Sequence, residues 1–158
     1  MTRLRLGLAL TILAGYAGIV QSAPVYVPEA EVMDRLAPVY ATRDPLRLAR
    51  AYRAMGDYGL PAADIVESSI NAMGYQRLEG GEIDEAISVF ELNTETFPLS
   101  ANAWDSLAEA AMSKGDHEAA IRYYRRSLEL NPDNNNAARM IERISGEQQL
   151  SQVSSTNS

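Results

Sequence analysis

The sequence predicts an all-α fold built from stacked helical hairpins. The stretch GEIDEAISVFELNTETFPLS at 81–100 has nearly the same pattern as GDHEAAIRYYRRSLELNPDN at 115–134, and the two stretches begin 34 residues apart. Glycine and proline separate the helical stretches, and no segment shows the alternation of apolar and polar residues that is typical of a strand. A helical hairpin of this length cannot bury its apolar face alone, so we expect the copies to stack side by side.

The composition limits the kinds of partner. The chain has 158 residues, with 14 basic and 21 acidic side chains and no cysteine. Two of the basic residues, Arg3 and Arg5, lie at the N-terminus, so the rest of the chain is more acidic than the whole. We therefore expect no binding to nucleic acid or to anionic membranes. The lack of cysteine excludes disulfides, a catalytic thiol and thiolate-bound metals.

The first 22 residues have the three parts of a secretory signal peptide. Arg3 and Arg5 precede an apolar stretch at 6–20, and Ser22 is small enough for position −1 of a cleavage site. A helix that spans a membrane needs ~20 apolar residues, so cleavage is favoured over an uncleaved anchor. The sequence predicts a bacterial periplasmic or secreted protein with no membrane attachment after cleavage.

Residues 23–60 are expected to form a linker and N-terminal helices. Pro28 and Pro38 leave room for only a short helix at 29–37. Whether this segment forms a degenerate third repeat stays open.

An amphipathic helix is expected at 45–56, where it would cover one end of the repeats. Asp44 and Pro45 have the residue types of an N-cap and a first helical position. One face of this helix carries a stripe of basic residues, which is either a solvated face or a recognition surface. Its residues are Arg43, Arg47 and Arg50.

Five further helices form the predicted repeat domain at 61–145. Their expected ranges are 62–79, 83–97, 101–113, 116–130 and 135–145. The first four make two repeats, at about 67–100 and 101–134, and the fifth is a capping helix. The polar segment 146–158 is expected to be a disordered tail.

The two repeats agree at the positions where paired helices need particular residues. Small residues let helix axes approach to ~8–10 Å, glycine ends a helix in the left-handed conformation, and proline stops further helix. The matched pairs, each 34 residues apart, are Gly74 with Ala108, Gly81 with Gly115, Ala86 with Ala120, Phe90 with Tyr124 and Pro98 with Pro132. This pattern resembles the tetratricopeptide repeat family over about 67–145. The resemblance implies a short right-handed solenoid of helical hairpins with a C-terminal capping helix.

No catalytic, cofactor-binding or metal-binding residues are expected, and the chain is predicted not to be an enzyme. The single lysine, Lys114, follows Ala111 by three positions, so the S-x-x-K motif of penicillin-binding-type hydrolases is absent. His117 lies between Asp116 and Glu118, but adjacent helix positions do not face each other. This arrangement favours a surface histidine over a metal ligand.

The resemblance also implies a binding surface. In tetratricopeptide proteins the first helix of each repeat lines a concave groove that holds a peptide or a helix of a partner. The equivalent positions here are Ser68, Asn71, Tyr75, Asn102, Asp105, Glu109 and Met112, continued by Arg139 and Arg143 on the last helix. The sequence thus predicts an exported, non-catalytic protein that mediates protein–protein interaction through this groove. Self-association would also cover the exposed repeat ends.

A second resemblance leaves an alternative open. The stretches AYRAM, INAMGYQRL and AISVFELNTETFPLSANAWDSLAEA, within 48–145, are similar to the helical tail of some bacterial beta-lactamase-like serine hydrolases. This similarity implies a detached accessory domain that acts on a separate periplasmic serine hydrolase.

Overall fold

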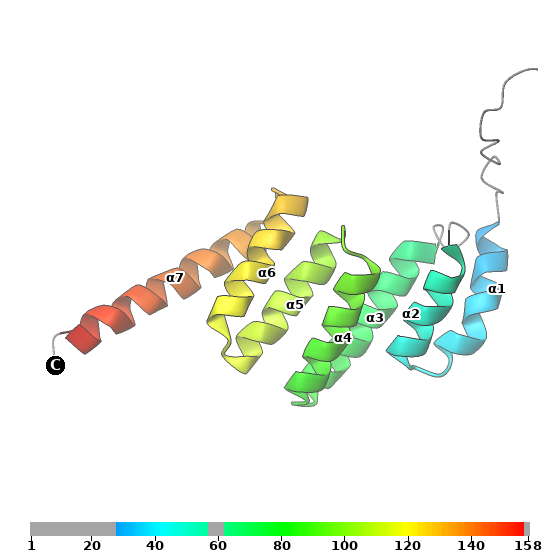
Figure 1. The fold of residues 1–158 in the computed structure, drawn as a ribbon, viewed down its shortest axis with the longest axis horizontal. Helices are drawn as coiled ribbons and strands as arrows, with labels where there is room; N and C mark the ends of the chain where they lie inside the picture. The colour runs from blue at the N-terminus through cyan, green and yellow to red at the C-terminus, as the bar shows by residue number, and fades with distance from the viewer. Residues whose placement is uncertain (1–27, 57–61, 157–158) are drawn as a thin grey trace, which may run out of the picture.

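The computed structural model of the chain confirms the all-α helical-repeat fold. It describes residues 28–56 and 62–156, so the predicted signal peptide lies outside the described residues. The described part contains seven helices and no strand, and none of these helices is long and apolar enough to cross a membrane. The helices lie in a row in chain order, with α7 projecting from one end (Figure 1). They are α1 (Glu29–Tyr40), α2 (Pro45–Ala54), α3 (Ala63–Glu79), α4 (Ile83–Thr96), α5 (Ala101–Lys114), α6 (His117–Leu130) and α7 (Asn135–Thr156).

Two helices begin at the aspartate caps that the sequence predicts. The Asp44 carboxylate accepts a hydrogen bond from the backbone N–H of Arg47 at 3.1 Å, and Pro45 occupies the first turn of α2. The Asp116 carboxylate accepts from the N–H of Ala119 at 2.9 Å at the start of α6. Each bond satisfies one of the N–H groups that a helix start leaves without a partner.

The ends of the helices within the repeats also follow the predicted residues. Gly81 and Gly115 adopt φ angles of +80° and +82°, the left-handed conformation expected after the first helix of each repeat. The second helices, α4 and α6, each end two residues before a proline, Pro98 and Pro132. The repeat boundaries are therefore local in origin, because they depend on backbone preferences of single residues.

The first helix is longer than the predicted range 29–37. It continues through Pro38 to Tyr40. Proline removes one backbone N–H, so the carbonyl of Asp34 loses its usual partner four positions on. The helix thus loses a single internal hydrogen bond, and it ends only two residues after the proline.

The last helix also extends beyond its predicted end, since α7 runs through Gly146 to Thr156, where a disordered tail at 146–158 was expected. A glycine inside a helix costs only about 1 kcal/mol relative to alanine. The residues from Glu147 to Leu150 include good helix formers and no proline, so nothing local stops the helix at the glycine.

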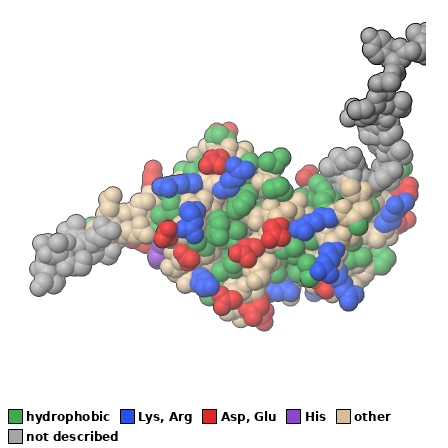
Figure 2. All heavy atoms as spheres, in the orientation of Figure 1, with side chains coloured by type: hydrophobic (Ala, Val, Ile, Leu, Met, Phe, Trp, Pro, Cys, Tyr) green, Lys and Arg blue, Asp and Glu red, His purple; other side chains and the backbone are tan. Residues whose placement is uncertain are grey.

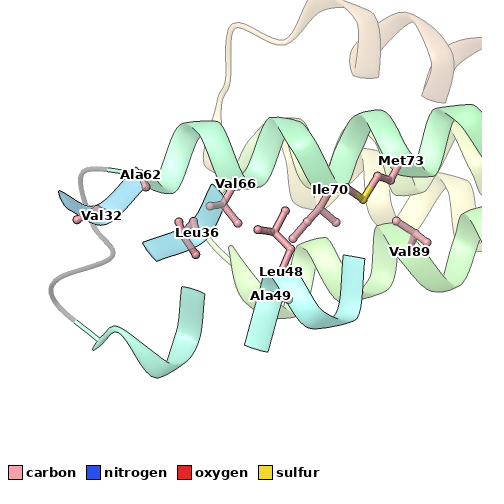
Figure 3. Packing of buried hydrophobic residues seen from close by; sticks show 9 residues of the cluster. All are labelled: Val32, Leu36, Leu48, Ala49, Ala62, Val66, Ile70, Met73 and Val89. Atoms are coloured by element: carbon pink, nitrogen blue, oxygen red, sulfur yellow. The ribbon is translucent and has the colours of Figure 1, made fainter. Parts of the chain in front are cut away.

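The N-terminal hairpin of α1 and α2 covers one end of the repeats, which confirms the position predicted for the second of these helices. Leu36 and Leu48 lie against Val66 and Ile70 of α3, and all four are 2% exposed or less (Figure 3). This packing gives the two matching repeats a third hairpin to stack on, close to the number of units that repeat folds need for stability.

The two helices of the first repeat cross at Gly74, as predicted. A Cβ atom placed on Gly74 would lie 2.5 Å from Cε1 of Phe90, so the aromatic ring fills the space that the glycine leaves. Phe90 is fully buried, and its ring meets the Tyr75 ring edge-on with centroids 5.1 Å apart. The second repeat has Ala108 and Tyr124 at the equivalent positions, both fully buried.

Candidate functional site

Two of the predicted groove residues lie side by side on α3 and α5. The Tyr75 hydroxyl donates to Oε2 of Glu109 at 2.6 Å and approaches Oγ of Ser106 at 3.1 Å. Burial and the hydrogen bond to Glu109 hold the pKa of Tyr75 well above its ordinary value, so its hydroxyl remains a donor at physiological pH. The bond fixes one carboxylate oxygen of Glu109 and leaves Oε1 without a hydrogen bond from the described residues.

Asn71 adds an unsatisfied acceptor beside this pair. It lies one helical turn before Tyr75, on the same face of α3. Its Oδ1 atom is buried and has no hydrogen-bond partner among the described residues. A buried polar atom without a partner costs about 1–3 kcal/mol.

Charged groups of both signs surround the hydroxyl of Tyr124, which the sequence analysis did not include in the site. Burial raises the pKa of Tyr124, the carboxylates of Glu109 and Asp105 act in the same direction, and the Arg143 guanidinium opposes them. Asp105, Glu109 and Arg143 thus each act on the same hydroxyl. The structure therefore brings together predicted groove residues from α5 and α7.

Asp105 is engaged within the fold. Its Oδ1 accepts from Nδ2 of Asn134 at 2.8 Å, and its Oδ2 accepts from Nδ2 of Asn136 at 3.3 Å. Asn134 in turn caps α7, because its Oδ1 accepts from the N–H of Ala137 at 3.2 Å. Asp105 thus helps to position the last helix, and removing its carboxylate would disturb more than a binding surface.

Three other predicted groove residues also have contacts inside the molecule. Asn102 donates to Oε1 of Glu67 at 2.9 Å, which joins the first helices of the two repeats. The Ser68 hydroxyl donates to the carbonyl of Ile65 in its own helix at 3.1 Å. Met112 is half-buried and packs into the C-terminal core.

The arginines predicted to continue the groove are exposed on α7. Neither Arg139 nor Arg143 forms an ion pair with a described residue. Sequence reasoning missed Asn134, although an asparagine directly before a helix is a common N-cap and could have been found. Its bond to Asp105 joins positions 29 residues apart and has no comparable signal in the sequence.

His117 differs from the expected surface histidine. It is half-buried, and its Nδ1 atom is buried with no hydrogen-bond partner among the described residues. In the part of the chain that the structure describes, no group of three or more histidine, aspartate and glutamate side chains could hold a metal ion.

The stacked hairpins define a helical-repeat protein, and comparison with known proteins shows what it is similar to. Residues 101–134 match the model of the tetratricopeptide repeat. A segment of 60 residues is 32% identical to mouse Superkiller complex protein 3 and 30% identical to the human protein. The match covers 38% of this chain but only 4% of those proteins. The chain therefore spans a small fraction of the length of these curated relatives.

Solved structures share the fold. The first tetratricopeptide domain of human RPAP3 aligns with a TM-score of 0.52 and 17% identity, over 80% of this chain and 96% of that one. MamA aligns with a TM-score of 0.53 and 18% identity, over 77% of this chain and 75% of its own. The first such domain of Spaghetti (RPAP3) was solved with the HSP90 peptide SRMEEVD. It aligns with a TM-score of 0.50 and 16% identity, over 77% of this chain and 93% of that one. Residues 101–134 thus match a tetratricopeptide repeat, and the chain shares the fold of solved tetratricopeptide domains.

Proposed function

We propose that the chain is a non-catalytic interaction protein whose concave groove binds an extended segment of a partner protein. The observation that carries the proposal is the group of acceptors on α3 and α5. Asn71 Oδ1 is buried without a partner, and Glu109 Oε1 lies beside the Tyr75 contact without a hydrogen bond from the described residues.

The charge of the groove favours a segment that supplies hydrogen-bond donors. Glu109 and Asp105 make its centre acidic, whereas the peptide bound by the Spaghetti domain, SRMEEVD, contains three acidic residues. A lysine or arginine side chain, or backbone N–H groups, would complement the acceptors here. The proposed partner is therefore a basic or mixed-charge segment of another protein.

Affinity capture from a cell-envelope extract tests the groove. The bait is the chain without residues 1–22, and the test variant combines Asn71→Ala with Glu109→Gln. We expect the unaltered bait to retain a protein that the variant retains about fivefold less, because exposed charge pairs contribute up to ~1 kcal/mol each. Asp105 is left unchanged because it holds Asn134 and Asn136.

A matched control carries the same loss of charge outside the groove. Glu85→Gln lies on an exposed position of α4 and should bind like the unaltered bait. Equal retention by the groove variant, or no protein retained above background by either bait, contradicts the groove proposal. Circular dichroism must first show that all baits fold alike.

Export through a cleaved signal peptide is part of the same proposal. It rests on the basic start and the apolar stretch at 6–20. Measurement of the intact mass of the protein produced in a bacterial host should show the loss of residues 1–22. A full-length mass would argue against this part.

The resemblance to hydrolase tails stays a prediction, and capture of a serine hydrolase by the unaltered bait would favour it.

A further inference from the structure

An open pocket lies outside the groove residues, between the C-terminal end of α1 and the side of α3. Its volume is about 420 Å³. A smaller hollow of about 330 Å³ shares Arg43 and Gln76 with it and adds Arg77 and Glu82. We call the combined depression the α1–α3 pocket. The residues that the argument uses are Tyr40, Arg43, Met73, Gln76, Arg77 and Glu82.

The α1–α3 pocket combines an apolar part with unpaired polar groups. Tyr40 lies at the pocket with 49% of its surface exposed, and Met73 is 9% exposed. These side chains can cover an apolar side chain of a partner. The side-chain amide of Gln76 makes no hydrogen bond with a described residue. The pocket therefore offers both apolar contact and hydrogen bonding.

Its arginines are not neutralised by the protein itself. Basic side chains gather over the part of the molecule that contains α2 (Figure 2), and two of them pair with acidic side chains. Arg47 pairs with Asp44 at 3.2 Å, and Arg53 lies 3.8 Å from Glu95. Among the described residues no such ion pair involves Arg43 or Arg77, in a chain of net charge −7. Positive charge at this pocket is thus available to a partner.

Arg43 does not belong to the basic stripe on α2 that the sequence predicts. It precedes the helix, in the turn after α1, with a φ angle of +51°. The Thr42 hydroxyl fixes this turn, donating to the carbonyl of Val39 at 2.6 Å and accepting from the N–H of Asp44 at 3.3 Å. Glycine or asparagine would adopt the left-handed conformation at lower cost, so the backbone does not explain an arginine here.

Arg77 is held beside the same pocket. Its Nη1 atom donates to the carbonyl of Met73 at 2.8 Å, which uses one of its five N–H donors. Glu82 lines the outer hollow and is the acidic group that faces these arginines. Its carboxylate lies beyond ion-pair distance of either arginine. It therefore reduces the positive potential of the pocket but does not neutralise it.

From this combination we infer that the α1–α3 pocket binds a partner segment in which an apolar residue is next to an aspartate or glutamate. The carboxylate pairs with the Arg43 guanidinium, whose planar fork suits it. Gln76 donates a further hydrogen bond, and the apolar side chain lies against Tyr40 and Met73. The preferred charge is opposite to that of the groove, so the two surfaces select different residues.

A peptide titration followed by nuclear magnetic resonance tests this inference. The probe is acetyl-Gly-Phe-Glu-Gly-amide, added to the purified ¹⁵N-labelled protein, and its matched control has glutamine in place of glutamate. We expect saturable shifts at the backbone N–H groups of Arg43, Gln76 and Arg77. The glutamine peptide should bind about threefold to fivefold more weakly, the range of an exposed ion pair.

Substitutions separate the charge from the fold. Arg43→Asn keeps a residue that tolerates the left-handed conformation and should lower affinity about threefold to fivefold. Arg43→Lys should retain part of the affinity because it keeps the charge but not the fork. Glu82→Gln should tighten binding, since it removes the opposing carboxylate. If Arg43→Asn does not fold, the lysine variant and the salt dependence of binding still show whether the charge of Arg43 contributes to peptide binding.

Some outcomes would overturn the inference. They are equal binding of the glutamate and glutamine peptides, shifts centred on Tyr75 instead of Arg43, and inorganic phosphate binding as tightly as the glutamate peptide. Glu109→Gln, which tests the groove, should leave this titration unchanged. A failure of the groove proposal and a failure of the pocket inference are therefore distinguishable.

Discussion

Replacing Phe90 by alanine is expected to destabilise the protein by about 3–5 kcal/mol. The Phe90 side chain is fully buried and packs with Ala86 of its own helix and Leu107 of α5. Its ring also lies edge-on to Tyr75 of α3. Truncation would leave a cavity where three helices meet, and Gly74 opposite has no side chain that could move into it.

Urea unfolding followed by far-ultraviolet circular dichroism measures this effect. Leu46→Ala is the control, because Leu46 is 44% exposed on α2 and its truncation should change stability by no more than about 0.5 kcal/mol. Small proteins have total stabilities of about 5–15 kcal/mol, so a loss of this size can unfold much of the Phe90→Ala protein. Phe90→Leu then provides the milder variant, with a smaller loss in the same direction. A change in Phe90→Ala no larger than that of the control would contradict the predicted packing.

Substitution of Gly74 by alanine should also destabilise the protein, by about 1–3 kcal/mol. The new Cβ would lie 2.5, 2.7 and 2.9 Å from Cε1, Cζ and Cδ1 of Phe90. The ring is fully buried and cannot move away without disturbing its neighbours. Alanine favours the helical backbone by about 1 kcal/mol, which offsets only part of this strain.

Gly146→Ala is the matched control for this second prediction. It changes the same residue type inside α7, where no atom lies within 4 Å of the new Cβ. Here only the helix preference of alanine acts, so urea unfolding should show that the free energy of unfolding rises by up to about 1 kcal/mol. In a Phe90→Leu background the penalty at Gly74 should shrink, because the two residues are in contact. A Gly74→Ala protein as stable as the unaltered chain would show that the helices can separate without cost.

In the second repeat, other residues occupy the equivalent helix crossing. Ala108 already carries a Cβ opposite Tyr124, and both side chains are fully buried. The sequence predicts small residues at both crossings, because each pair of helices must approach closely. It does not predict which aromatic side chain fills each crossing tightly, since that depends on the helix positions to within a fraction of an ångström.

The sequence determined the helical repeat and most of its boundaries. Asp44 and Asp116 cap their helices, and Gly81 and Gly115 adopt the left-handed conformation, as predicted. These features depend on one residue and its immediate neighbours, so they can be inferred without knowing the fold.

Tertiary structure alone decided the roles of particular side chains. It assigned Asp105 to the positioning of α7, and it placed Arg43 beside Gln76, 33 positions later, in a pocket that no sequence pattern indicates. Such contacts join segments whose separation depends on how whole helices pack, whereas caps and breakers act within a few residues. The repeat could therefore be predicted from the sequence. The surfaces that it offers to partners depend on how its helices stack.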